Sequence, residues 1–173
     1  NYEEIVKILL KNENIDVNDY LQYSDTGKIV LCHVEKTALN IAIEKEYVNI
    51  VEILLQHPNI DINKKLKHND CNFDILSIHD RYIEKIALIL AVEKENLKIL
   101  SLLLNHPNID VNITSRLNDY IYVRDHGCKG NKYAERTALS IAIEKNNMKM
   151  VQLLLKNHVI DLNSLLFFYI CCY

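Results

Sequence analysis

The chain has 173 residues, of which 49% are hydrophobic and 25% are charged, and its net charge is −3. This composition is typical of a globular domain and excludes an intrinsically disordered chain. The slight negative charge, with no basic face apparent in the sequence, argues against nucleic-acid binding, which needs Lys and Arg to neutralise phosphates.

In chain order, the sequence consists of one partial and three complete copies of a repeat. The partial copy spans residues 1–18, and the complete copies span residues 37–63, 86–112 and 137–163. In each complete copy, apolar residues recur at spacings of three and four over two successive stretches, which predicts two short amphipathic helices. Helices this short are marginal alone in water. We therefore expect stacked copies in one domain over residues 1–173, since only three Gly and two Pro leave no flexible linker.

The ends of these helices can be predicted from side-chain chemistry. Thr37 and Thr137 stand where an N-cap hydroxyl accepts from the backbone, and the second copy has Ile86 there, which removes about 1 kcal/mol of capping. His57 and His106 each precede Pro-Asn at the end of the second helix, where an imidazolium is favoured by the helix C-terminus.

Three insertions, residues 19–36, 64–85 and 113–136, separate the copies. Strand-like runs flank turn residues in the first and third insertions, which predicts β-hairpins. The second lacks Gly, so it could be a hairpin or a short extra helix. The chain finishes with an apolar tail, residues 164–173, which we expect to fold onto the last repeat, although contact with a missing segment or partner and, least of all, a membrane anchor remain alternatives.

These copies resemble the ankyrin repeat. The family's T-P-L-H-x-A motif appears as Thr37-Ala38-Leu39-Asn40-Ile41-Ala42, its I-V-x-x-L-L pattern follows from Ile50, and its D-V-N appears as Asp61-Ile62-Asn63. Successive Asp16, Asp61, Asp110 and Asp161 lie 45, 49 and 51 residues apart, whereas the family repeats about every 33 residues. The excess lies mainly between D-V-N and the next first helix, where the family places a β-hairpin finger. The family's Gly between the helices is replaced by Glu46, Glu95 and Asn146, which predicts another turn geometry.

The resemblance implies an all-α, ankyrin-type helix-pair solenoid with extended β-hairpin or loop fingers. It also implies a non-catalytic protein-binding scaffold that uses finger tips and the concave face of the first helices. Tyr is enriched in the insertions and suits recognition surfaces, but each Tyr could equally pack one finger against the next. The candidate binding residues are Tyr20, Tyr23, Asn40, Glu44, Tyr82, Ile89, Glu93, Tyr120, Tyr122, Arg124, Tyr133, Ser140 and Glu144.

An alternative is a regulatory array cut from a larger enzyme, channel or ubiquitin-ligase adaptor. We expect a monomer, with end-to-end association as an option, and no cofactor or membrane partner.

The residues do not suggest catalysis or a metal site. Each insertion carries Cys and His, such as Cys32 with His33 and Cys128 with His126, but no C-x-x-C spacing points to zinc. Neither a phosphate loop nor a nucleophile motif is present. Five Cys without a secreted spacing pattern favour reduced thiols and a cytoplasmic or nuclear protein.

Overall fold

The computed structural model describes residues 2–24, 33–70, 81–118, 133–157 and 159–162. Helices and strands alternate in a regular order along the chain. They are α1 (Tyr2–Leu10), β1 (Leu21–Ser24), β2 (His33–Lys36), α2 (Ala38–Glu44), α3 (Val48–Leu55), β3 (Leu66–Asp70), β4 (Arg81–Lys85), α4 (Ala87–Glu93), α5 (Leu97–Leu104), β5 (Ser115–Asn118), β6 (Tyr133–Arg136), α6 (Ala138–Glu144) and α7 (Met148–Leu155).

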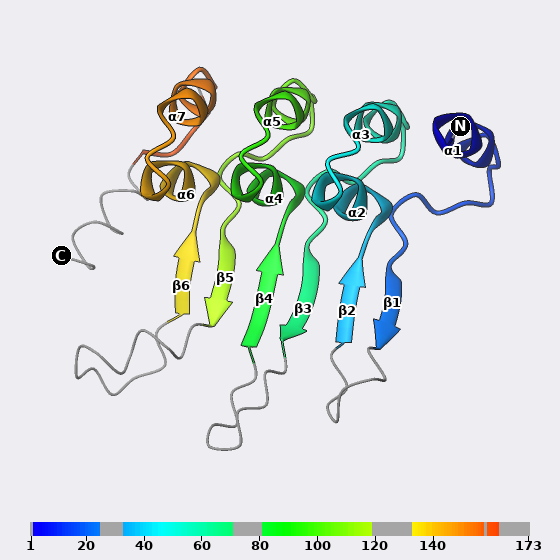
Figure 1. The fold of residues 1–173 in the computed structure, drawn as a ribbon, viewed down its shortest axis with the longest axis horizontal. Coiled ribbons are helices and arrows are strands. Elements are labelled where there is room, and N and C mark those ends of the chain that lie inside the picture. Colours follow the sequence, from blue (N-terminus) through cyan, green and yellow to red (C-terminus); the bar gives the residue numbers. More distant parts are fainter. Residues whose placement is uncertain (1, 25–32, 71–80, 119–132, 158, 163–173) are drawn as a thin grey trace.

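The helices form two parallel rows. Figure 1 shows an inner row of α2, α4 and α6 beneath an outer row of α1, α3, α5 and α7, with the strands hanging from the inner row. Each inner helix packs on the outer helix that follows it, and α4 packs on both α2 and α6. The expected helix-pair solenoid is therefore confirmed.

The core is densest at the central inner helix, because α4 has a repeat on either side. All six residues from Ala87 to Val92 are buried there. Small side chains such as Ala91 let neighbouring helices approach closely, and the larger Leu88 and Val92 are also fully buried. Buried side chains of all three complete repeats join in one apolar cluster.

Two of the three inner helices begin with the expected caps. The Thr37 hydroxyl accepts from the backbone N–H of Asn40, the Asn40 side chain accepts from the Thr37 backbone N–H, and Thr137 and Ser140 make the same capping box. Ile86 makes no side-chain cap, as expected, but its side chain is fully buried. The second copy thus replaces a capping bond by apolar burial.

The prediction of another turn geometry between the helices was wrong. Glu46, Glu95 and Asn146 have φ of 57°, 56° and 53°, so they hold the left-handed conformation that Gly adopts most easily. The turn is closed by backbone bonds that demand this conformation: Glu46 N–H donates to the Ile43 carbonyl at 3.0 Å and Tyr47 N–H to the Ala42 carbonyl at 2.9 Å. These bonds define the turn whichever residue occupies it.

The histidines after the outer helices act as acceptors. The Nδ1 atom of His57 accepts from the backbone N–H of Asn59 at 3.3 Å, and His106 accepts from Asn108 at the same distance. A protonated nitrogen cannot accept a hydrogen bond. The Nδ1 atoms therefore cap these turns as acceptors, a contact that the sequence did not indicate.

An asparagine ladder joins consecutive repeats along their turns. The Asn18 side chain donates through Nδ2 to the Asn59 carbonyl at 2.6 Å, and its Oδ1 accepts from the Asp61 N–H at 2.7 Å. The same two bonds join Asn63 to Asn108 and Asp110, and Asn112 to Val159 and Asp161. Asp16, Asp61 and Asp110 of the D-V-N segments each accept from the backbone N–H of the Asn two residues on, at 2.9, 3.0 and 2.9 Å.

The fingers are β-hairpins, and neighbouring hairpins also pair with each other. The result is one antiparallel six-stranded sheet in the order β1-β2-β3-β4-β5-β6. The second insertion is a hairpin in its described part, where β3 and β4 pair from Leu66↔Lys85 to Asp70↔Arg81. The alternative of an extra helix therefore fails for these residues, and residues 71–80 lie outside the described part.

Candidate binding surface

Three of the expected contact residues on the inner helices are buried. Asn40, Ile89 and Ser140 occupy the same position in the three repeats, and none is exposed enough to meet a partner. The physical reason in α2 and α6 is that the side chain at this position bonds back to the N-cap residue of its own helix. Asn40 Oδ1 accepts from the Thr37 N–H at 3.1 Å and from its hydroxyl at 2.8 Å, and Ile89 lies in the core. Direct partner contact through these three residues was a wrong expectation.

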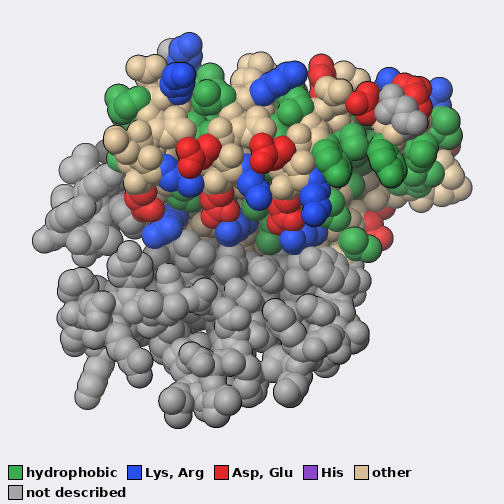
Figure 2. All heavy atoms as spheres, in the orientation of Figure 1, with side chains coloured by type: hydrophobic (Ala, Val, Ile, Leu, Met, Phe, Trp, Pro, Cys, Tyr) green, Lys and Arg blue, Asp and Glu red, His purple; other side chains and the backbone are tan. Residues whose placement is uncertain are grey.

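The expected glutamates form a row of ion pairs where the helices meet the fingers. Glu44 pairs with Lys36 at 2.7 Å, Glu93 with Lys85 at 2.7 Å and Glu144 with Arg136 at 3.4 Å. In each pair the last residue of a finger strand meets the last residue of the inner helix that follows. We call these six residues the ion-pair row. Figure 2 shows bands of Lys/Arg and Asp/Glu side chains alternating along this side of the molecule.

The ion-pair row is partly exposed. Side-chain exposure across the three pairs ranges from 15% for Lys36 to 31% for Arg136. Partly exposed pairs contribute about 1 kcal/mol or less each, so their main effect is positional. They hold the root of each finger against its own repeat and leave alternating charges of both signs at the surface.

Tyr20 packs between fingers. Its hydroxyl donates to the Lys65 carbonyl at 2.7 Å, and the Lys64 ammonium lies 4.2 Å from the ring centroid in a cation–π contact. Burial, helped by the charge of Glu35, raises the pKa of the Tyr20 hydroxyl, which keeps it protonated as a donor. Tyr20 thus joins the root of the first finger to that of the second, as the packing alternative predicts.

The other candidates lie on the fingers. The backbones of Tyr23, Tyr82 and Tyr133 belong to β1, β4 and β6, where they stand opposite Val34, Asn69 and Asn118. Tyr120, Tyr122 and Arg124 fall outside the described residues, as do all five cysteines.

The sheet brings the free ends of all three fingers together along one side, where its strands end. Each hairpin reaches its last described pair on that side: Ser24↔His33, Asp70↔Arg81 and Asn118↔Tyr133. The described strand residues on either side of the gaps 25–32, 71–80 and 119–132 therefore all lie along the same side of the sheet. Three insertions that are far apart in the sequence are thereby placed next to one another in space.

The pairing between fingers was missed at the sequence level, although a signal for it exists. Between the first two fingers Glu35 stands opposite Lys67, and between the next two Glu84 stands opposite Arg116. Opposite charges across an antiparallel pair favour that register. An acidic residue near the end of one insertion and a basic residue near the start of the next predict such pairing.

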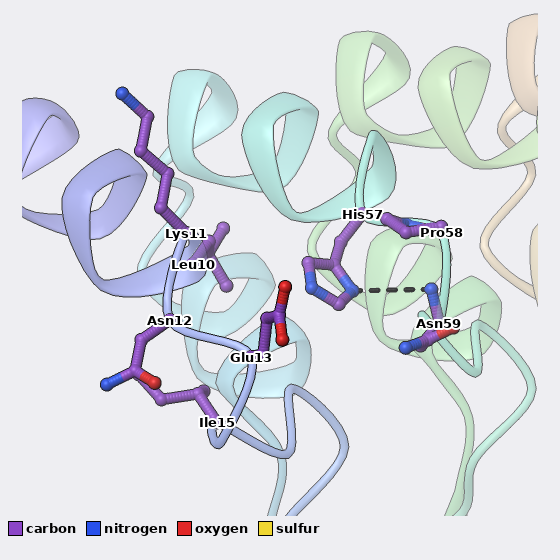
Figure 3. Close-up of a pocket in the computed structure, with 8 residues that line it drawn as sticks. All are labelled: Leu10, Lys11, Asn12, Glu13, Ile15, His57, Pro58 and Asn59. Atoms are coloured by element: carbon purple, nitrogen blue, oxygen red, sulfur yellow. Dashed lines mark hydrogen bonds between the residues drawn. The ribbon is translucent and has the colours of Figure 1, made fainter.

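A pocket of about 300 Å³ lies between the turns after α1 and α3. It is lined by turn residues, and Figure 3 shows Glu13 and His57 projecting into the space between them. The His57 Nδ1 is already engaged by the Asn59 N–H. Ser, Thr, Cys and a second carboxylate are missing from the residues that line this pocket.

Within the described ranges no three His, Cys, Asp or Glu residues gather as metal ligands would. None of the helices in those same ranges is long and apolar enough to cross a bilayer.

Comparison with known proteins agrees with the architecture. A family model described as ankyrin repeats in three copies matches residues 1–66 and 64–166. A similar solved structure is that of EF0377, an ankyrin repeat protein, with 19% identity and a TM-score of 0.32 over 88% of this chain and 90% of that one. No curated protein matches the chain. Because the family model matches nearly the whole sequence, the chain belongs to the ankyrin repeat family.

Proposed function

We propose that this protein is a non-catalytic scaffold that binds a partner protein along the side of the sheet where the strands of its three fingers end. Ankyrin repeats generally mediate protein–protein interaction. The main support for binding through the fingers is the six-stranded sheet. Its strands belong to the three insertions that lengthen the repeats, so the insertions lie side by side.

A paired sheet suits this role for an energetic reason. A lone two-stranded hairpin is marginally stable in water, whereas three or more paired strands on a packed scaffold are stable. Binding through fingers that are already paired loses less conformational entropy than binding through separate loops. The ion-pair row and Tyr20 add to this effect, since they hold the finger roots in place.

Recognition would then come from the finger segments, with the ion-pair row as a flanking polar contact. Tyr120, Tyr122 and Arg124 supply residue types that are enriched among binding hot spots. Glu44, Glu93 and Glu144 are the inner-helix candidates that remain, because they are partly exposed. We place this activity in the cytoplasm, where five cysteines would stay reduced.

The test compares the full chain with three shortened variants. In each variant one finger segment, residues 25–32, 71–80 or 119–132, is replaced by Asn-Gly, which closes a two-residue hairpin between the described strand ends. A matched control carries Glu52→Ala and Gln152→Ala, two exposed positions on outer helices away from the fingers. Thermal unfolding followed by circular dichroism verifies that every variant is folded.

A partner captured from a source lysate is then titrated against each purified variant by calorimetry. The proposal predicts that at least one shortened finger weakens binding tenfold or more while the outer-helix control binds normally. Equal binding by all three shortened variants would refute it.

A further inference from the structure

The turn between the two helices of each repeat carries a similar short segment in all three complete copies. The segments are residues 45–49, 94–98 and 145–149, with the sequences KEYVN, KENLK and KNNMK. Each begins with the Lys that follows an inner helix and ends in the first turn of the outer helix. We call these three segments the turn stripe, because stacking of the helix pairs places them in a row.

Large apolar side chains are exposed along the turn stripe. Tyr47 is 55% exposed, Leu97 36% and Met148 61%. The exposure of the first two does not come from an end of the array, because α3 packs between α1 and α5, and α5 packs between α3 and α7. Tyr47 and Leu97 therefore stay uncovered although a repeat lies on either side of each.

The turn stripe is basic, in a chain whose net charge is −3. Its three segments hold five Lys and two Glu. Glu46 accepts a hydrogen bond from the Asn96 side chain of the next repeat at 3.0 Å. Glu95 uses both of its carboxylate oxygens, which accept from Lys145 at 3.0 Å and from Asn147 at 3.3 Å. The two acidic groups of the stripe are thus engaged between repeats.

Lysines flank the exposed apolar side chains of α5 and α7. Leu97 lies between Lys94 and Lys98 in the sequence, and Lys149 follows Met148. Lys94, Lys98 and Lys149 are exposed, and within the described residues none of them forms an ion pair. Figure 2 shows Lys/Arg side chains next to hydrophobic ones over α5 and α7. This combination is complementary to a partner surface that is both apolar and acidic.

We propose that the turn stripe binds an acidic amphipathic helix of a partner protein. Packed helices lie about 8–10 Å apart, so successive repeats present Tyr47, Leu97 and Met148 at about that spacing. Seven residues of an α-helix span about 10.5 Å and return to nearly the same face. A partner helix with a large apolar residue at every seventh position therefore matches one apolar side chain of the stripe in each repeat. Glu residues three and four positions after each apolar residue lie on the same face and meet the lysines.

The charges favour a protein helix over a lipid surface. The positions of α1 that correspond to Leu97 and Lys98 hold Glu3 and Glu4, so the basic character belongs to the complete repeats. A helix of about 15 residues spans three apolar contacts and covers only α3, α5 and α7. An anionic bilayer is continuous, and it would also meet the carboxylates of α1.

The turn stripe is separate from the fingers, and the proposal does not rest on the proposed function. The stripe belongs to the helix pairs, whereas the strands hang from the inner row (Figure 1). Leu155 and Lys156 at the end of α7 repeat the Leu-Lys sequence of Leu97 and Lys98 outside the stripe. Leu155 is 45% exposed and Lys156 is exposed, so this pair provides a matched control.

The test uses the full chain and a fluorescent helical peptide made of three Ala-Ala-Leu-Ala-Ala-Glu-Glu repeats. Fluorescence anisotropy at low ionic strength is expected to show saturable binding. Leu97→Glu with Lys98→Glu should weaken it by about tenfold or more, and Leu155→Glu with Lys156→Glu by less than about twofold. A peptide with Lys in place of Glu should bind at least about tenfold more weakly. Thermal unfolding followed by circular dichroism verifies that both variants are folded.

Absence of binding by the Glu peptide overturns the proposal, as does an equal loss in the two double variants or equal binding of the Lys peptide. Two further results also overturn it, because each assigns the stripe to another occupant. Sedimentation that reveals a dimer dissociated by Leu97→Glu with Lys98→Glu assigns it to a second copy of this chain. Binding to phosphatidylserine vesicles in place of the peptide, abolished by the same variant, assigns it to a lipid surface.

Discussion

Removing one rung of the asparagine ladder should destabilise the whole array. In Asn63→Ala the side chain loses a 2.7 Å bond to the Asn108 carbonyl and a 3.0 Å bond from the Asp110 N–H. Each hydrogen bond contributes about 0.5–1.5 kcal/mol net, so the two together contribute about 1–3 kcal/mol. Asn108 and Asp110 are exposed, so water can satisfy the freed backbone groups. We therefore expect a loss near the middle of that range.

A loss of about 2 kcal/mol corresponds to a Tm lower by roughly 4–8 °C in a chain of this length. Urea unfolding followed by circular dichroism gives the free energy of unfolding, and a thermal scan gives Tm. Asn59→Ala is the matched control, because it removes the same side chain from an exposed position of the same turn and leaves the backbone rung in place.

Asn63→Asp separates hydrogen bonding from packing. The aspartate has the same shape, but it places an oxygen where Nδ2 now donates to the Asn108 carbonyl, so this variant should lose at least as much stability as Asn63→Ala. If Asn63→Ala matches Asn59→Ala within about 0.5 kcal/mol, the ladder does not couple the repeats and the reasoning is wrong.

Three further variants test local features. Thr37→Val keeps the shape of the side chain but removes the cap and leaves the buried Asn40 side chain without its hydroxyl donor, so urea unfolding should show a loss of about 1–3 kcal/mol; a loss under about 0.5 kcal/mol would contradict the capping role. Glu46 has a φ of 57°, so Glu46→Gly should be more stable than Glu46→Ala by about 1 kcal/mol, because both lose the side chain and only Gly relieves the left-handed strain; equal stabilities would count against strain. The hydrogen bond from Lys145, with its charge, lowers the pKa of Glu95 from 4.5, so the bond stabilises the fold above the unfolded pKa and is lost as the pH falls through the folded pKa. An NMR titration should place the Glu95 midpoint below 4.5 and find it raised in Lys145→Met; an unchanged midpoint would exclude this pair as the cause.

Much of the helical part could be predicted from the sequence. Apolar spacing located the helix pairs, and Thr37 and Thr137 marked the starts of α2 and α6, since a cap depends on residues only three apart. The turn at Glu46 was mispredicted because Gly was taken as a requirement. Backbone bonds over five residues define that turn, and a non-Gly residue adopts it at a modest cost in free energy.

The candidate site was less predictable, because the burial of a side chain depends on which other helices and strands pack over it. Asn40 and Ser140 are polar and looked available, but each turns back to its own cap and is covered by neighbouring packing. Glu44 stayed on the surface because its partner Lys36 reaches it from the finger. Tyr20 was left between two interpretations, which the Lys65 carbonyl resolves in favour of packing.

The sequence by itself determined the repeat, the helix pairs and the hairpin character of the first and third fingers, since each depends on residues close together in the chain. Only the tertiary structure decided that the fingers pair into one sheet and that Asn18 bonds to the turn at Asn59 and Asp61. These contacts join residues more than thirty positions apart. Stacking of the repeats brings these residues together, and no local sequence pattern indicates which residues of two repeats will come into contact.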